Sequence, residues 1–267
     1  MRILGRFGVV AAVILTGCKL SSDLPTHVPA GIINATTVSD GSDGFTTSPV
    51  GIFYNNVNVT PPSDSRLAPD SCVDTTFVAP TNPGSPNVTN VDAGASIAVQ
   101  TDLATGSMTP DTDEFGLISY VIPNSGSVPL SAGSTVTFVV PGAENGFAAM
   151  TITAPTVHPY TLGPIDTMPA DSMLITWTPA DGAPAAMDLS FQYALDSNRT
   201  TPNRQIACRF VDDGSGYIKK QFAAHWRQAA PGTRHIDSQR WRTTQQTIDF
   251  NSLVVQSRFN VSKTTFP

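Results

Sequence analysis

The order of apolar and polar positions sets the first residues apart from the rest of the chain. Arg2 and Arg6 give a cationic start, and residues 7–15 form an apolar run. Two small residues, Thr16 and Gly17, separate this run from Cys18. A membrane-spanning helix needs about 20 apolar residues, so this run is too short to be one. A cationic start, a short apolar stretch and small residues before a cut site are typical of a secretory leader.

The residues Leu15-Thr16-Gly17-Cys18 resemble a bacterial lipobox. This resemblance implies that residues 1–17 are removed as a signal peptide and that Cys18 is acylated. Two or three acyl chains, at about 0.8 kcal/mol per buried methylene, anchor a protein stably. Lys19 stands where an Asp retains some lipoproteins at the inner membrane. We therefore expect a lipid-anchored protein of the bacterial cell envelope, at the outer membrane.

After a short tether that ends at residue 29, strand-length runs recur between turn clusters. Turn clusters such as Asn82-Pro83-Gly84 and Asn124-Ser125-Gly126 separate them. The runs cover residues 32–38, 50–59, 72–78, 97–103, 117–122, 135–140 and 147–153. No helical crossover separates these runs, which disfavours a parallel sheet. Their number and spacing predict a β-sandwich, which we place in an N-terminal domain of residues 30–157.

A second series of runs follows a Pro-rich stretch and predicts a C-terminal β domain of residues 158–267. These runs cover residues 173–178, 187–193, 206–211, 234–243 and 253–261. In residues 173–178 and 253–259 apolar side chains alternate with polar ones, which indicates strands with one wet face. Residues 217–228 differ, because Ile218, Phe222 and Trp226 recur at four-residue steps and predict a short helix. The expected fold class is all-β, with two β-sandwich domains.

Composition supports this fold class. Thr and Ser together supply 56 of the 267 residues, whereas there are only two Glu and four Lys, which excludes coiled coils and long helices. Residues 19–157 carry 2 basic and 12 acidic side chains, and residues 158–267 carry 11 and 9. The two parts therefore differ in charge, and their faces can attract each other at close range.

Several short motifs are similar to those of uncharacterised lipoproteins common in myxobacteria and their relatives. They are Asp92-Ala93-Gly94, the run Leu174-Ile175-Thr176-Trp177-Thr178, residues 206–216 with Cys208 and Asp212-Asp213-Gly214, and the closing strand of residues 254–259. The resemblance implies an immunoglobulin-like or fibronectin-type sandwich and brings no known activity. Lys219-Lys220 departs from it, where a small or apolar pair is expected.

Candidate chemistry is sparse. The loop Asp212-Asp213-Gly214 can offer oxygens to Ca²⁺, but this composition is also that of a turn, which we favour. The acidic loop with Asp111, Asp113 and Glu114 is interpreted in the same way. The four histidines, His27, His158, His225 and His235, lack the spacing of a zinc site. Neither Gly106-Ser107 nor Gly133-Ser134 has the second glycine of a nucleophile elbow.

Basic and aromatic residues gather near the predicted helix and the strand after it. They are Lys219, Lys220, Arg227, Arg234, Arg240 and Arg242 with Tyr217, Trp226 and Trp241. Such residues can bind nucleic acid, but an exported protein rarely meets it, so lipid phosphate, an anionic glycan or the acidic first domain are better partners. The simpler interpretation, which we favour, is solvated strand faces with the Trp rings in the core.

Cys72 and Cys208 are the thiols that remain once Cys18 carries lipid. Export favours a disulfide between them. However, Cys208 alternates with apolar residues and is expected to face a core, and Cys72 begins a strand of the other predicted domain. Two separate buried thiols are therefore the alternative. The resemblance implies that both cysteines belong to the pattern.

Three function classes follow. We favour a non-enzymatic envelope lipoprotein that serves as a structural, adhesion or scaffold module, with no catalytic residues, cofactor, metal or nucleic-acid partner. Its expected partners are the membrane, through the anchor, and an envelope protein or glycan. A carbohydrate-binding lipoprotein is the alternative, and an exposed Trp177 or Trp241 on a concave face would favour it. A hydrolase is the second alternative, and it requires two acids about 5–9.5 Å apart in one cleft.

Overall fold

The computed structural model describes residues 28–39, 44–56, 67–77, 89–163, 172–180 and 185–263. The predicted signal peptide, the acylation site Cys18 and nearly all of the tether lie outside the described residues, as does His27. Within those residues, strands dominate and a single α-helix is present, which confirms the all-β prediction. No helix in this part of the chain is long and apolar enough to cross a membrane.

The elements follow one another along the chain without long helical connections. The strands are β1 (Val28–Ser39), β2 (Phe45–Asn56), β3 (Ser71–Thr76), β4 (Thr89–Asn90), β5 (Ile97–Gln100), β6 (Thr105–Thr112), β7 (Ile118–Val121), β8 (Val128–Leu130), β9 (Thr135–Val140), β10 (Met150–Pro155), β11 (Met173–Thr176), β12 (Ala186–Tyr193), β13 (Arg204–Val211), β14 (Ser215–Ile218), β15 (His235–Ile248) and β16 (Asn251–Lys263). The helix is α1 (Lys220–Gln228), and short 3₁₀ helices cover Pro123–Ser125 and Pro231–Thr233.

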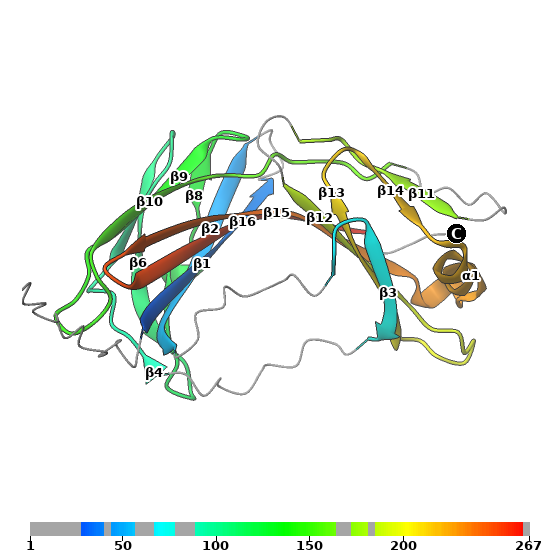
Figure 1. Ribbon diagram of the computed structural model, residues 1–267, viewed down its shortest axis with the longest axis horizontal. Coiled ribbons are helices and arrows are strands. Elements are labelled where there is room, and N and C mark those ends of the chain that lie inside the picture. The colour runs from blue at the N-terminus through cyan, green and yellow to red at the C-terminus, as the bar shows by residue number, and fades with distance from the viewer. Residues whose placement is uncertain are drawn as a thin grey trace, which may run out of the picture.

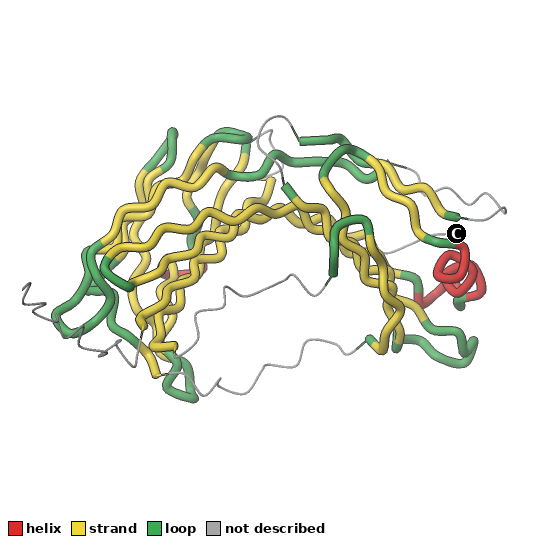
Figure 2. The backbone as a smooth tube through the Cα atoms, in the orientation of Figure 1, coloured by secondary structure: helices red, strands yellow, loops and turns green. Residues whose placement is uncertain are grey.

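Fourteen of these strands form one continuous sheet, which is arched (Figures 1 and 2). Its order is β10-β9-β5-β6-β7-β2-β1-β16-β15-β12-β13-β3, and β4 and β8 also pair with β2. All neighbours are antiparallel except β1 and β16, which are parallel over eight residue pairs. A two-stranded sheet of β11 and β14 lies with α1 on the outer side of the arch (Figure 1).

Two hydrophobic cores stabilise the two ends of the arch. In the first, Ile33 and Phe53 of β1 and β2 pack with Phe138 and Ile152 of β9 and β10. In the second, alternate residues of β12 and β13 pack with β11, β14 and α1, and Trp226 of the helix is part of this core. The first core therefore lies between strands of the one long sheet, and the second lies between that sheet and the layer of β11, β14 and α1.

Side chains from both sides of the predicted boundary at residue 157 pack together in the two cores. Leu253 and Val255 of β16 belong to the first core, and Cys72 of β3 packs against the second. The long strands β15 and β16 run through both halves of the sheet. Alternation along one strand shows which face is buried, but it does not show which strand lies beside it. The two-sandwich interpretation of the sequence is therefore not confirmed.

The predicted helix is present but begins later than expected. It covers Lys220–Gln228, whereas Tyr217 and Ile218 end strand β14. Its buried residues are Ala223 and Trp226, which are three residues apart, and Phe222 is only partly buried against the same core. Strands β4, β6, β8 and β14 were not expected from the sequence; β6, for example, contains Pro110 and several exposed polar residues. Their pairing with neighbours, rather than their own composition, makes them strands.

The hairpin between β15 and β16 turns on two residues with left-handed backbone. Asp249 has φ 45° and Phe250 has φ 67°, and they connect the last residue pair, Ile248 and Asn251. A two-residue connection with both φ values positive is a type I′ turn, which favours Gly at its second position. The Phe250 side chain is 64% exposed and so gains little from packing.

We therefore expect Phe250→Gly to stabilise the protein by about 1 kcal/mol, because it relieves a left-handed residue that carries a Cβ. Thermal unfolding measures this as a higher midpoint. The matched control is Phe250→Ala, which removes the same ring but keeps the Cβ and should bring no gain. Equal midpoints for the Gly and Ala variants would contradict the prediction.

Candidate functional site on the inner face of the sheet

The strands of the second core carry polar side chains on the face that points away from it. In β12, Met187, Leu189 and Phe191 are buried in the core, so Asp188 and Ser190 between them point to the opposite side. Because α1, β11 and β14 cover the outer side of the arch (Figure 1), these polar residues lie on its concave side. We call this surface the inner face.

Strand register aligns the inner-face residues of four strands into rows. The first row, from β13 through β12 and β15 to β16, is Arg209, Asp188, Gln239 and Asn260. The second row is Ala207, Ser190, Asp237 and Ser262. Side chains that are opposite each other in this way lie about 4.5–5.5 Å apart at Cβ. The rows therefore bring together residues that lie as much as 74 positions apart in the chain.

A cavity of about 420 Å³ opens on these rows, and all eight row residues line it together with Gln205 and Leu67. Its volume is within the range of small-ligand sites, which begins at about 300 Å³. Ala207 stands between longer side chains, with Arg209 and Gln205 two residues away on the same face. We call this depression the inner-face cavity.

Asp188 is held by three donors at one end of the cavity. Arg209 donates from Nε and Nη2 to its two carboxylate oxygens at 2.9 and 3.0 Å. Trp241 donates from its indole Nε1 at 2.8 Å, and the Arg209 guanidinium lies 4.9 Å from the centre of the Trp241 ring. This bidentate pair fixes the orientation of both planar groups. Trp241 is partly exposed, whereas Trp177 and Trp226 are buried.

Asp237 occupies the other end and also accepts several hydrogen bonds. Gln192 Nε2 donates to one oxygen at 2.7 Å, and Ser262 Oγ donates to the other at 2.7 Å. His235 Nε2 lies 2.8 Å from that second oxygen. Cross-strand bonds thus continue over the whole inner face and give it a fixed arrangement of donors and acceptors.

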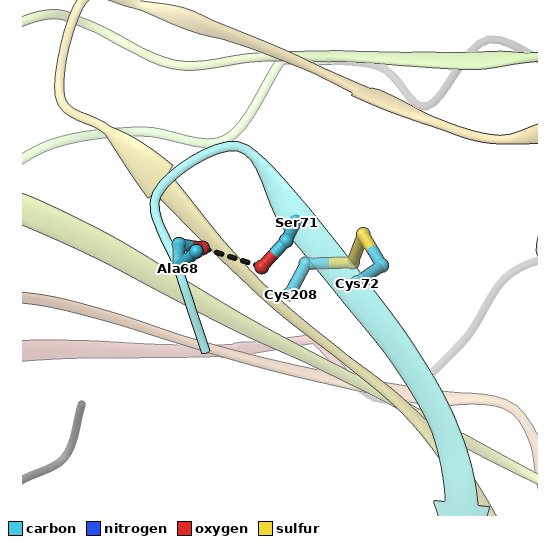
Figure 3. Close-up of a disulfide and its surroundings, with 4 residues drawn as sticks. All are labelled: Ala68, Ser71, Cys72 and Cys208. Carbon is cyan, nitrogen blue, oxygen red and sulfur yellow. Dashed lines mark hydrogen bonds between the residues drawn. A yellow bond between two sulfur atoms is a disulfide. The ribbon is translucent and has the colours of Figure 1, made fainter. Parts of the chain in front are cut away.

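A disulfide joins Cys72 and Cys208 on the core side of the same strands (Figure 3). Their Cα atoms are 4.1 Å apart, and the two residues are directly opposite in the β3–β13 ladder. Of the two alternatives that the sequence left open, the structure contains the bridge. Cys208 also faces the core, as its alternation predicts. Ser71 donates a hydrogen bond from Oγ to the carbonyl of Ala68 where β3 begins (Figure 3).

The loop that the sequence singled out for Ca²⁺ or a turn contains a buried ion pair. Asp212 is 1% exposed and Arg240 is fully buried, with Nε and the carboxylate 2.8 Å apart. Trp177 Nε1 donates to Asp212 at 2.7 Å. Asp213 accepts a bond from the Ser215 amide, and Gly214 has φ 100°, as in a turn. The favoured turn interpretation therefore agrees with the geometry. The Asp212 carboxylate is bonded to Arg240 and Trp177 within the protein.

Tyr160 packs against this ion pair, and its pKa indicates that the surroundings of the pair exclude water. The Arg240 guanidinium is 4.8 Å from the centre of the Tyr160 ring, and the hydroxyl donates to Ser238 Oγ at 2.7 Å. Burial raises the pKa of Tyr160 to about 12. Arg240 Nη1 donates to the carbonyl of His158 at 2.9 Å, and Nη2 donates to that of Thr178. These contacts are structural.

A second buried carboxylate, that of Asp74, connects β3 to helix α1. Asp74 is 7% exposed in its side chain and accepts a hydrogen bond from Tyr193 at 2.9 Å. Arg204 donates to it at 3.0 Å, and His225 Nδ1 lies 2.5 Å away. Burial alone would raise the pKa of Asp74, but the bonds from His225, Tyr193 and Arg204 outweigh it and hold that pKa below its usual value. His225 thus ties the helix to the sheet.

The other sequence candidates are dispersed. Asp113 accepts bonds from the Phe115 and Leu117 amides and shapes its own loop. Arg234 donates to the carbonyls of Arg227 and Ala229 at the end of α1. The basic and aromatic residues that the sequence grouped therefore do not share one surface, because Arg240 and Trp226 are buried. Among the described residues, no group of three or more His, Cys, Asp or Glu is arranged to hold a metal ion.

Sequence reasoning did not select the inner-face residues. It predicted the strands that carry them, but it predicted a wet face only for residues 173–178 and 253–259. The signal lay in which polar residues occupy that face: amides and carboxylates, at Gln205, Gln239, Asn260, Asp188 and Asp237. Only the strand order shows that these positions lie side by side.

Comparisons with known proteins add no relative. No family model, curated protein or solved structure matches the chain. The resemblance to myxobacterial-type lipoproteins therefore stays a prediction from short motifs.

Proposed function

We propose that this protein is a lipid-anchored envelope lipoprotein that acts as a non-enzymatic binding module, in an adhesion or scaffold role. The observation that carries the proposal is the inner-face cavity, in which polar groups from four strands are fixed by one another. A binding site benefits from such pre-organisation, because little conformational entropy is lost when a ligand is held. The sequence signal at Leu15 to Cys18 supplies the location.

The acids of the cavity bear on the hydrolase alternative. Asp188 and Asp237 are diagonal neighbours on β12 and β15, a relation that sets their Cα atoms about 7–8 Å apart. A general acid or base must be free to contact the substrate. Asp188 receives three hydrogen bonds and Asp237 is contacted by Gln192, Ser262 and His235. This arrangement favours binding over catalysis.

Membrane fractionation tests the anchor. We expect wild-type protein to enter the detergent phase and to remain with outer membranes, because acyl chains on Cys18 bury many methylenes. Cys18→Ala should leave the protein in the aqueous phase or in its uncleaved form. Lys19→Asp is the control for sorting, since it keeps the acylated Cys and should change only which membrane retains the protein. Unchanged detergent partition of Cys18→Ala would contradict the proposal.

A further inference from the structure

We infer that the inner-face cavity binds a neutral oligosaccharide, and that three amide side chains at its rim select it. The inference rests on the proposed function and names the ligand class of that same site. It follows from three properties of the cavity: the unused ends of its amides, its small net charge, and the floor formed by Ala207.

Three amides line the cavity, and each has one end bonded within the protein. Gln205 accepts a bond from Ser190 with Oε1, and Gln239 donates from Nε2 to Asn260 Oδ1 at 2.8 Å. The Gln205 NH₂, the Gln239 carbonyl and the Asn260 NH₂ have no other partner among the described residues. The cavity therefore presents donors and acceptors in alternation. Sugar hydroxyls both donate and accept, so they fit this mixture.

Charge narrows the ligand class. The described residues that line the cavity include two carboxylates, Asp188 and Asp237, and one guanidinium, Arg209, which is already paired with Asp188. Among these residues an anionic ligand would meet an excess of negative charge, and the Arg209 guanidinium is engaged. The acid and guanidinium pair also fixes the plane of Trp241 beside the cavity. A neutral polyol has no charge that the cavity must compensate, and its hydroxyls can form hydrogen bonds with the fixed polar groups.

Ala207 lines the cavity and is a position at which the inference can be tested. Its neighbours on the same face of β13 are Gln205 and Arg209, and Val73 of β3 is opposite it. A large side chain at 207 would fill the cavity from its floor without entering either core, because the core side of β13 carries Ile206 and Cys208. Ala207→Trp should therefore block binding and leave folding intact.

The experiment is a titration of the full chain, purified in detergent, with maltotetraose, cellotetraose and N-acetylated chitotetraose by calorimetry. We expect at least one tetrasaccharide to bind saturably. Gln239→Leu and Asn260→Leu should each weaken that binding about 3- to 10-fold, as the loss of one hydrogen bond does. Ala207→Trp should abolish it. The matched control is Thr151→Trp, an exposed position on β10, which should bind like wild type.

Two further measurements distinguish a neutral sugar from a cationic ligand and binding from hydrolysis. Competition with tetralysine probes a cationic ligand, and a reducing-end assay follows hydrolysis of each sugar. No saturable binding up to 10 mM (about 3 kcal/mol), unchanged binding in Ala207→Trp, or tighter binding of tetralysine would overturn the inference. Failure of this kind leaves the membrane fractionation result untouched. Hydrolysis abolished by Asp237→Asn would instead refute the non-enzymatic proposal while supporting the sugar site.

Discussion

The double variant Cys72→Ala/Cys208→Ala is expected to lose about 5 kcal/mol of unfolding free energy. The bridge closes a loop of 136 residues, and on the chain-entropy model a loop of this length restricts the unfolded chain by about that amount. A single domain is typically stable by about 5–15 kcal/mol, so the loss should bring the variant close to unfolding at 25 °C. Urea titration measures the change.

Reduction of the wild-type protein provides the control. Dithiothreitol should shift its urea midpoint to that of the double variant, because both treatments remove the same cross-link. The slope of the transition should also rise, since an uncrosslinked chain exposes more surface on unfolding. A wild-type midpoint that dithiothreitol leaves in place, with Cys72 and Cys208 shown to be alkylated, would contradict the prediction.

Arg240→Met is expected to cost about 3–5 kcal/mol, because it leaves the Asp212 carboxylate buried without its cation. The substitution also removes the donors that satisfy the carbonyls of His158 and Thr178. Calorimetric or urea unfolding measures the loss. The matched control is Arg199→Met, which makes the same change at an exposed arginine and should stay within about 0.5 kcal/mol.

A second variant separates the charge from the packing. Arg240→Met/Asp212→Leu should recover part of the loss, since a buried pair replaced on both sides by apolar groups leaves no uncompensated charge. Equal stability of the single and double variants would show that the lost bonds to the backbone carbonyls dominate. A stability of Arg240→Met equal to wild type would contradict the prediction.

Local sequence patterns predicted the strands well because the tendency to form a strand depends on neighbouring residues in the chain. Residues 135–140 were expected as a strand and form β9, and the alternation of apolar residues around Cys208 correctly placed that side chain on the core side of β13. The same local patterns did not predict the order of the strands in the sheet. β1 is hydrogen-bonded to β16, more than 200 residues later, and nothing in either run specifies the other.

The cysteines and the candidate site show the same limit. The sequence assigned Cys72 to the N-terminal domain, and this made a bridge to Cys208 hard to place; β3 in fact pairs with β13, so the two are opposite each other. Likewise, Asp188 and Asn260 are ordinary wet-face residues until register aligns their strands. Pairings between distant segments depend on the summed fit of whole faces, which one strand does not encode.

The parallel pairing of β1 with β16 also determines how the fold resists mechanical load. β1 begins at Val28, and it lies between β2 on one side and β16 on the other. A pull on the chain before Val28 acts along the strand, so both ladders are loaded in shear and their hydrogen bonds must break together rather than one after another. The adjoining strand β16 carries Asn260 and Ser262 of the inner-face cavity. Tension between the N-terminal end of the chain and a ligand held by these two residues would therefore cross one strand interface, that between β1 and β16.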